Sequence, residues 1–222
     1  MKIRILVPVV VALVLSGGAM GIQKYISSQI TSKVQQEMPK ASGVSASVPL
    51  LDVPRNLRSD SIKSADINIK SMPLKESGTK TSLNISASSI SKSKPTLVGS
   101  LEITATIPAS TITTTSQFNN AEIVGNKLQV ATGAGGMGTA ILVPKFSNNL
   151  LYFELESVSL FGTQIPASSL PGDLQSQIKS KSKRALTPPK GLKVKSVSLS
   201  SKGLSIKMAG NNIQLGNLGS GF

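Results

Sequence analysis

The glycine-rich segment from Gly133 to Gly138 has the residue spacing of a dinucleotide-binding loop. Its sequence, Gly-Ala-Gly-Gly-Met-Gly, matches the G-x-G-x-x-G pattern and follows a short apolar run from Leu128 to Ala131. A dinucleotide-binding loop must lead into a helix, because the helix N-terminus holds the pyrophosphate. The next residues, Thr139 to Pro144, instead have the pattern of a strand followed by a break. We interpret the segment as a turn between strands and expect no cofactor.

Glu154 and Glu156 are a second candidate for chemistry, since paired carboxylates can act as the acid and the base of a glycosidase. Residues two apart on a strand point to the same face, and Tyr152 shares that face. The intervening positions are apolar: Leu151, Phe153 and Leu155. The solvated outer face of a sheet explains this pattern fully, so we assign no catalytic role to the pair.

Histidine and cysteine are both absent from the chain. Their absence excludes the commonest general base, thiolate nucleophiles, disulfides, and zinc, haem or iron–sulfur sites built on those ligands. Ser77 and Lys80 have the spacing of a Ser–Lys dyad, but the chain is so rich in both residue types that such pairs arise by chance. We therefore predict no catalytic residue, no metal site and no enzymatic activity.

The net charge is +14, from 24 basic and 10 acidic residues, so the chain attracts polyanions. No acidic residue follows Asp173, whereas basic residues continue as far as Lys207. This pattern favours contact with an anionic membrane surface, although a solvated basic face gives the same pattern. The candidate contact residues are Lys179, Lys181, Lys183, Arg184, Lys193 and Lys195.

The N-terminus has the order of a secretory signal: basic residues, an apolar run from Ile5 to Leu15, and small residues up to Ala19. Residues 5–22 carry no charge and are just long enough to span a bilayer, so either cleavage or retention as an anchor is consistent with the sequence. Residues 1–22 are thus a signal peptide or membrane anchor. Export to the periplasm or cell envelope, together with the scarcity of aromatic rings, argues against nucleic acid as the partner.

A long N-terminal helix is expected at Gln23 to Met38, ending at Pro39. Apolar residues recur there every four positions, and a broad apolar stripe of this kind suits a helix packed inside a curved sheet. The stripe comprises Ile22, Ile26, Ile30, Val34 and Met38.

Most of the remaining chain alternates between apolar and polar residues, which is typical of antiparallel strands with one wet face. A short helix is expected at Pro108 to Phe118 and a late helix at Leu170 to Leu186. A C-terminal hairpin is expected to turn at Lys202 and Gly203. The predicted fold class is α+β, with the N-terminal helix in a curved antiparallel sheet that forms an elongated half-barrel. A single domain would span residues 23–215, followed by a flexible tail at 216–222.

An aliphatic inner wall in such a half-barrel would accept acyl chains. The candidate groove residues are Ile26, Ile30, Val34, Ile67, Ile69, Ile85, Ile103, Leu151, Phe153 and Leu155. The favoured hypothesis is a non-enzymatic protein that binds or transfers phospholipid or a related envelope lipid. The alternative is a scaffolding protein of the envelope that binds a partner protein through a sheet edge.

Several segments resemble the LmeA-like phospholipid-binding family of actinobacterial envelopes, over most of the chain from Gln23 to Leu215. Besides the signal and helix at the start and the glycine-rich strand pair, these segments are Val48–Asp52, Ser61–Ile67, Pro189–Val197 and Gly203–Ile206. The resemblance implies phospholipid binding in the outer envelope without known catalysis. It also implies a plan similar to that of tubular lipid-binding proteins, in which a curved sheet wraps a long helix.

The export signal can be tested with a reporter that is active only outside the cytoplasm. We expect a fusion of residues 1–40 to such a reporter to be active, because Lys2 and Arg4 precede an uncharged apolar run. A control fusion in which Val9 and Val11 are both replaced by Lys should be inactive, because the apolar run is then interrupted by charge. A stable but silent unmodified fusion would rule out export by this segment.

Overall fold

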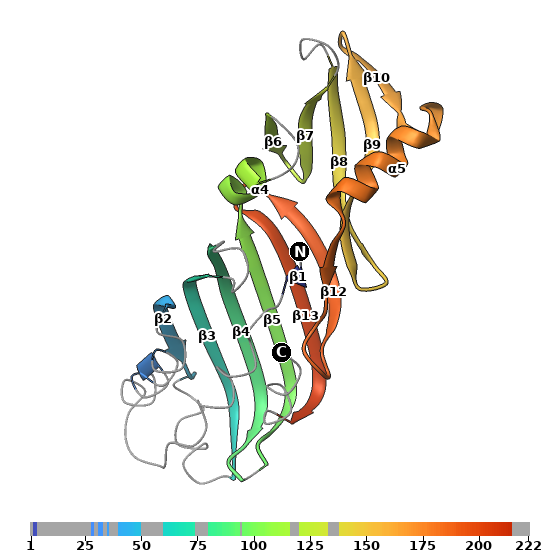
Figure 1. Cartoon of the computed structure of the whole chain (residues 1–222). Helices are drawn as coiled ribbons and strands as arrows, with labels where there is room; N and C mark the ends of the chain where they lie inside the picture. Colours follow the sequence, from blue (N-terminus) through green and yellow to red (C-terminus); the bar gives the residue numbers. More distant parts are fainter. Residues whose placement is uncertain are drawn as a thin grey trace. The chain divides into compact units, whose positions relative to one another are not determined.

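In a computed structural model of the chain (Figure 1), the structure describes residues 2–3, 28, 31–32, 35, 40–49, 60–73, 80–93, 95–115, 120–132 and 138–214. The chain divides into two compact units. Unit 1 consists of Met1–Ile3, Thr106–Thr187 and Ser196–Ile206. Unit 2 consists of Arg4–Ala105, Pro188–Lys195 and Lys207–Phe222. Among the described residues, the strands form one sheet of seven strands and one of six.

The seven-stranded sheet belongs to unit 1 and has the strand order β1-β11-β9-β8-β7-β6, with β10 also paired to β9. Its strands are β1 (Lys2–Ile3), β6 (Ala121–Val124), β7 (Lys127–Thr132), β8 (Gly138–Ser147), β9 (Leu150–Leu160), β10 (Thr163–Pro166) and β11 (Arg184–Leu186). Strand β1 runs parallel to β11, whereas the pairs formed by β6 to β10 are antiparallel.

The six-stranded sheet has the order β12-β13-β5-β4-β3-β2, and β2, β3, β4 and most of β5 lie in unit 2. Its strands are β2 (Ser42–Ser47), β3 (Ser61–Pro73), β4 (Lys80–Ser91), β5 (Leu97–Pro108), β12 (Lys193–Ser200) and β13 (Gly203–Gln214). The central strands are twice the usual strand length of about six residues, because the alternation of apolar and polar residues continues along most of each strand.

The register of β3 and β4 explains which residues form the core. Ile67 lies opposite Ile85 and Ile69 opposite Leu83, and all four side chains are buried. The intervening pairs are polar and lie on the outer face, as with Asp66 opposite Ser86. Since opposite residues of an antiparallel pair share a face, one register separates the apolar from the polar side chains.

Helices are short in the described part of the chain. Those whose bounds are described are α4 (Ala109–Thr115), the 3-10 turn η3 (Ala167–Ser169) and α5 (Gly172–Ser182). Helix α5 occupies only the middle of the range 170–186 predicted for a late helix. The backbone is extended at Pro171 and at Lys183, and the residues that follow join the sheet as β11.

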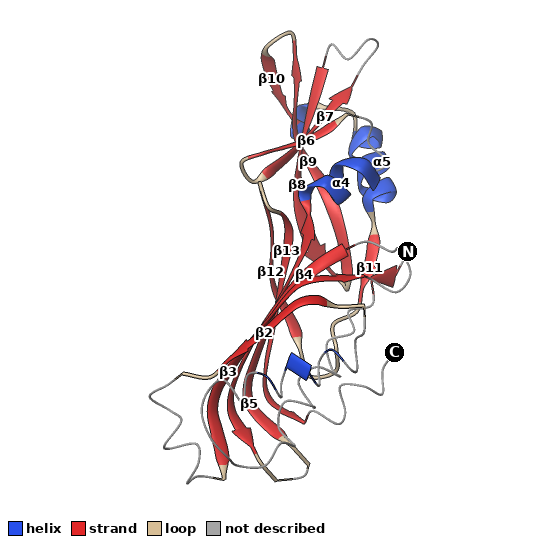
Figure 2. Ribbon diagram, turned by 90° about the vertical axis from the view of Figure 1, so that its left-hand side faces the viewer, coloured by secondary structure: helices blue, strands red, loops and turns tan. Residues whose placement is uncertain are grey.

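The predicted α+β fold class, with a long N-terminal helix inside one curved half-barrel, is wrong. The described residues are mostly strand, as Figure 2 shows by colour. Their strands are divided between two sheets. Within the range 23–38 only Ser28, Thr31, Ser32 and Gln35 are described, and these four are helical. Alternation predicts that a strand has one buried face, but it does not predict which sheet the strand joins, so one sheet was expected instead of two.

A hairpin turn connects β12 to β13 one residue earlier than expected: Ser201 and Lys202 form the turn, and Gly203 is the first residue of β13. Gly203 has a φ of +127°, and a Cβ at this position would collide with the carbonyl oxygen of Ile107. The amide of Ala109 donates a hydrogen bond to the carbonyl of Lys202, so the turn packs directly on the end of β5. This close approach of two backbones requires glycine.

The two faces of β5 should respond differently to a buried charge. Ile103 is fully buried, whereas Ser100 on the same strand is exposed. We expect Ile103→Asp to lower the free energy of unfolding by several kcal/mol, because an unpaired carboxylate would be desolvated. Ser100→Asp should change it by less than about 1 kcal/mol. Urea unfolding followed by circular dichroism measures both, and equal losses would mean that the assignment of faces is wrong.

Candidate functional site

Four of the predicted groove residues gather on the buried face of the six-stranded sheet. Ile67 and Ile69 lie on β3, Ile85 on β4 and Ile103 on β5, and each is at most 4% exposed. The other buried residues of these strands and of β13 within unit 2 are almost all aliphatic: Ala65, Met72, Leu83, Ala87, Ile90, Val98, Leu101, Ala105, Met208 and Ile213. We call this surface the aliphatic face. Its buried residues, as far as the structure describes them, include no aromatic side chain.

The other described groove candidates lie on the seven-stranded sheet of unit 1. Leu151 and Leu155 on β9 are buried, and Phe153 between them is half-buried. They pair with Phe146, Leu142 and Pro144 of β8. The structure therefore brings the candidates together as two sets on two sheets. Ile26, Ile30 and Val34 lie outside the described residues.

A hollow of about 260 Å³ lies on the outer face of β2, β3 and β4. The side chains that the register directs to this face are polar: Ser45, Ser47, Asp66, Asn68, Asn84 and Ser86. Asn68 Nδ2 donates a hydrogen bond of 2.6 Å to Asn84 Oδ1, and Ser86 Oγ donates one of 2.6 Å to Asp66 Oδ1. An acyl chain would gain nothing here, because its methylenes would displace water from amide and hydroxyl groups.

The sequence did not predict this polar hollow. The signal was present in the alternate positions of 64–68 and 84–88, which carry serine, asparagine and aspartate. Their juxtaposition depends on the register of β3 with β4, which places Asp66 opposite Ser86 and Asn68 opposite Asn84.

Glu154 and Glu156 are bound to lysines on the surface of the seven-stranded sheet. Glu156 Oε2 lies 2.6 Å from Lys127 Nζ, and Glu154 Oε2 lies 3.7 Å from Lys145 Nζ. Both carboxylates are about half exposed. Exposed ion pairs of this kind contribute little stability. The geometry agrees with a solvated outer face.

The strands that flank the glycine-rich segment settle its interpretation. Strands β7 and β8 pair with each other in antiparallel register, with Thr132 opposite Gly138. The segment thus connects two hairpin strands, and no helix follows it as a dinucleotide site requires. Residues 133–137 themselves lie outside the described part of the chain. Across the described residues, no three acidic side chains come together as a possible metal site.

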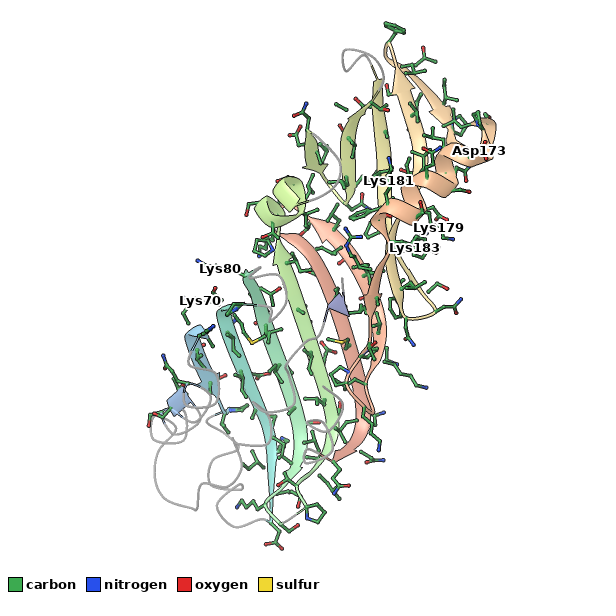
Figure 3. All side chains as sticks on the ribbon, viewed as in Figure 1. Lys70, Lys80, Asp173, Lys179, Lys181 and Lys183 are labelled. Atoms are coloured by element: carbon green, nitrogen blue, oxygen red, sulfur yellow. The ribbon has the colours of Figure 1, made fainter. Side chains whose placement is uncertain are left out.

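Four basic candidates form one cluster at the C-terminal end of α5 in unit 1. We call Lys179, Lys181, Lys183 and Arg184 the basic cluster. Figure 3 labels Lys179 and Lys181 in the last turn of the helix and Lys183 immediately after it. The three lysines are exposed, and none of the described carboxylates forms an ion pair with any of the four residues. Cations at this end also interact favourably with the helix dipole.

The basic cluster is held in place by contacts with β9. The Lys179 ammonium lies 4.6 Å from the centre of the Tyr152 ring, a cation–π contact. Ser182 Oγ accepts a hydrogen bond of 2.9 Å from the Phe153 amide and donates one of 2.8 Å to the Ile178 carbonyl. The Arg184 guanidinium donates to the carbonyls of Lys181 and Lys183. Ser182 was not predicted, because nothing in the sequence shows that it faces a strand edge.

The remaining two basic candidates, Lys193 and Lys195, are in unit 2. They are exposed and lie two residues apart on β12, the edge strand of the six-stranded sheet. The six predicted anionic-surface residues thus form two groups, four in unit 1 and two in unit 2.

The predicted signal or anchor at residues 5–22 lies outside the described residues. Lys2 and Ile3 are described, and they pair with Ala185 and Leu186 of β11. Among the helices of the described residues, none combines the length and the hydropathy that crossing a membrane requires.

Comparison of the chain with protein families, with curated proteins and with solved structures found no significant match.

The contribution of the basic cluster can be measured with anionic vesicles. Changing Lys179, Lys181, Lys183 and Arg184 together to Ser should weaken binding at low salt by more than tenfold, at roughly 1 kcal/mol for each cation near the surface. The difference should shrink at 1 M salt, where the Debye length is about 3 Å. Vesicle co-sedimentation is the measurement.

A control with the same change in charge separates a local contact from a general field effect. Lys40, Lys70, Lys80 and Lys190 are exposed residues of unit 2, and their joint replacement by Ser also removes four charges. We expect this control to bind almost as well as the parent. Equal losses in the two variants would mean that only net charge matters.

Proposed function

We propose that the protein is a non-enzymatic phospholipid-binding or lipid-transfer protein of the bacterial cell envelope. In this proposal, acyl chains pack against the aliphatic face, and basic residues bring the protein to anionic membranes. The observation that carries the proposal is the almost entirely aliphatic composition of that face over four neighbouring strands, β3, β4, β5 and β13.

The dimensions and chemistry of the aliphatic face suit an acyl chain. Strands β3 and β4, which lie wholly in unit 2, have 13 and 12 residues, which corresponds to about 40 Å of strand. The acyl chains of one bilayer leaflet extend over about 15 Å, half of the hydrocarbon core. Each methylene removed from water contributes about 0.8 kcal/mol, so a chain along this face would supply most of the affinity.

Burial determines how a lipid would reach this face. Ile69, Leu83 and Ile103 have no exposed surface, so a lipid would have to exchange places with protein groups that pack there. The hollow on the outer face offers no alternative for the acyl chains, because its side chains are polar. We therefore expect bound lipid to be retained through purification and to exchange slowly.

Two further observations support the proposal. The sequence segments that resemble the LmeA-like family include Ser61–Ile67, which forms the first half of β3 in the six-stranded sheet. The basic cluster provides exposed cations without carboxylate partners among the described residues. Both are consistent with binding to phospholipid, whose headgroup is charged and whose tails are aliphatic.

The direct test is extraction of the purified full chain with organic solvent, followed by mass spectrometry of the extract. We expect phospholipid to co-purify at a fixed ratio to protein. The lipid-free protein should also take up a fluorescent phospholipid from vesicles. A protein that carries no lipid and takes up none would rule out the proposal and favour the scaffolding alternative.

Two neighbouring residues of β4 provide matched variants. Ile85 lies on the aliphatic face and Ser86 on the outer face, so Ile85→Thr and Ser86→Thr place the same side chain on opposite sides of the sheet. Ile85→Thr should reduce the ratio of lipid to folded protein severalfold, because it adds a hydroxyl to the acyl contact. Ser86→Thr should leave the ratio unchanged. Circular dichroism measures the folded fraction of each variant, and the lipid ratio is calculated per folded protein.

A further inference from the structure

The turn between β9 and β10 exposes an aromatic side chain at the tip of a hairpin. Phe161 is 82% exposed, the highest value among the large hydrophobic residues that the structure describes, and Leu160 beside it is 36% exposed. The chain has only five phenylalanines, two tyrosines and no tryptophan. A phenylalanine stabilises a fold by being buried, so its exposure here is not explained by the packing of unit 1.

The backbone of this turn does not favour phenylalanine either. Leu160 pairs with Thr163, so Phe161 and Gly162 form a two-residue loop, with φ of +50° and +82°. Such loops favour asparagine at the first position, because bulky residues are disfavoured at positive φ. The two-residue loop between β8 and β9 follows this preference, with Asn148 and Asn149 at φ of +51° and +57°.

Among the described residues, the strand ends around Phe161 carry no charge. No charged residue occurs from Ser157 to Gly172, which includes both strands of the hairpin beyond Glu156. The neighbouring strands β7 and β8 reach the same end, since Thr132 pairs with Gly138 and Gly138 with Leu160, and both residues are uncharged. An uncharged tip can enter the polar–apolar boundary of a bilayer without the cost of dehydrating an ion.

We propose that the β9–β10 tip (Figure 1), with Phe161 in its turn, inserts into the interfacial region of a lipid bilayer. This insertion goes beyond the proposed lipid-binding function, because the aliphatic face belongs to the other sheet. It is also separate from the basic cluster. Ser182 fixes that cluster beside Phe153, roughly 25 Å along β9 from the tip, which exceeds the Debye length of about 8 Å at physiological ionic strength.

Fluorescence can test the insertion, because the chain contains no tryptophan. Phe161→Trp places a single fluorophore at the tip, and its emission should shift to the blue when phosphatidylcholine vesicles are added. The shift should persist at 1 M salt, since apolar insertion is not screened. Val124→Trp is the control: Val124 is 45% exposed in the same unit, and its emission should not change.

A second variant separates insertion from folding. Phe161→Asn gives the turn the residue that its backbone prefers, so the melting temperature should be unchanged or higher. Its partition into phosphatidylcholine vesicles should fall at least about tenfold, because the buried phenylalanine surface is lost. Val124→Asn should have no effect on partition. Lipid bound by the purified Phe161→Asn protein should equal that of the parent.

The outcomes distinguish this proposal from the proposed function. An emission of Phe161→Trp that no vesicle changes, or equal partition of Phe161→Asn and the parent, would overturn the insertion and leave the tip available for a protein partner. A blue shift in a protein that carries no extractable lipid would support the insertion. The same result would contradict only the proposed lipid-binding function.

Discussion

The structure depends on one constraint, the antiparallel register that sets like residues opposite each other. Ile67 faces Ile85 and Asp66 faces Ser86, so the alignment of β3 with β4 between Ala65 and Ile69 places apolar side chains on one side of the sheet and polar side chains on the other. A shift by one residue would place each isoleucine opposite a polar partner and on the wrong face. The chain has no disulfide and few aromatic residues to compensate for such an error. Its core therefore depends on aliphatic cross-strand pairs.

The same register places the apolar groove candidates and the polar side chains of the hollow on opposite faces of the six-stranded sheet. Every described groove candidate of the six-stranded sheet lies on the buried side, and every polar side chain of the hollow lies on the other. Where the register leaves a strand edge unpaired, other groups must satisfy the backbone. On β9, β11 pairs with Leu150 and Leu151, β10 pairs with residues 157–160, and Ser182 binds Phe153 in the gap between them. The position of α5, and with it the basic cluster, follows from that gap.

Alternation in the sequence was enough to predict most strands, the hairpin at Gly203 and the solvated position of Glu154 and Glu156. It could not predict the division into two sheets, because Leu155 on β9 and Ile103 on β5 have the same local pattern. The length of α5 was overestimated, since the pairing of Arg184 and Ala185 with β9 outweighs the helical preference of these residues. The polar hollow and the role of Ser182 depend on contacts between residues that are far apart in the sequence, and local sequence patterns contain no information about such contacts.

Phe161 shows what a local pattern can reveal once the backbone is known. In the sequence, Leu160-Phe161-Gly162 resembles the end of an apolar strand, and nothing distinguishes Phe161 from Phe153 eight residues earlier. In the structure, Phe153 is half-buried on β9, whereas Phe161 occupies a positive φ at a solvent-exposed tip. Natural sequences are expected to agree with their structures at every level, and departures concentrate where function opposes folding. Asn148 and Asn149 satisfy that expectation in the turn at the other end of β9, so the departure at Phe161 is specific to the tip and not a property of the sheet.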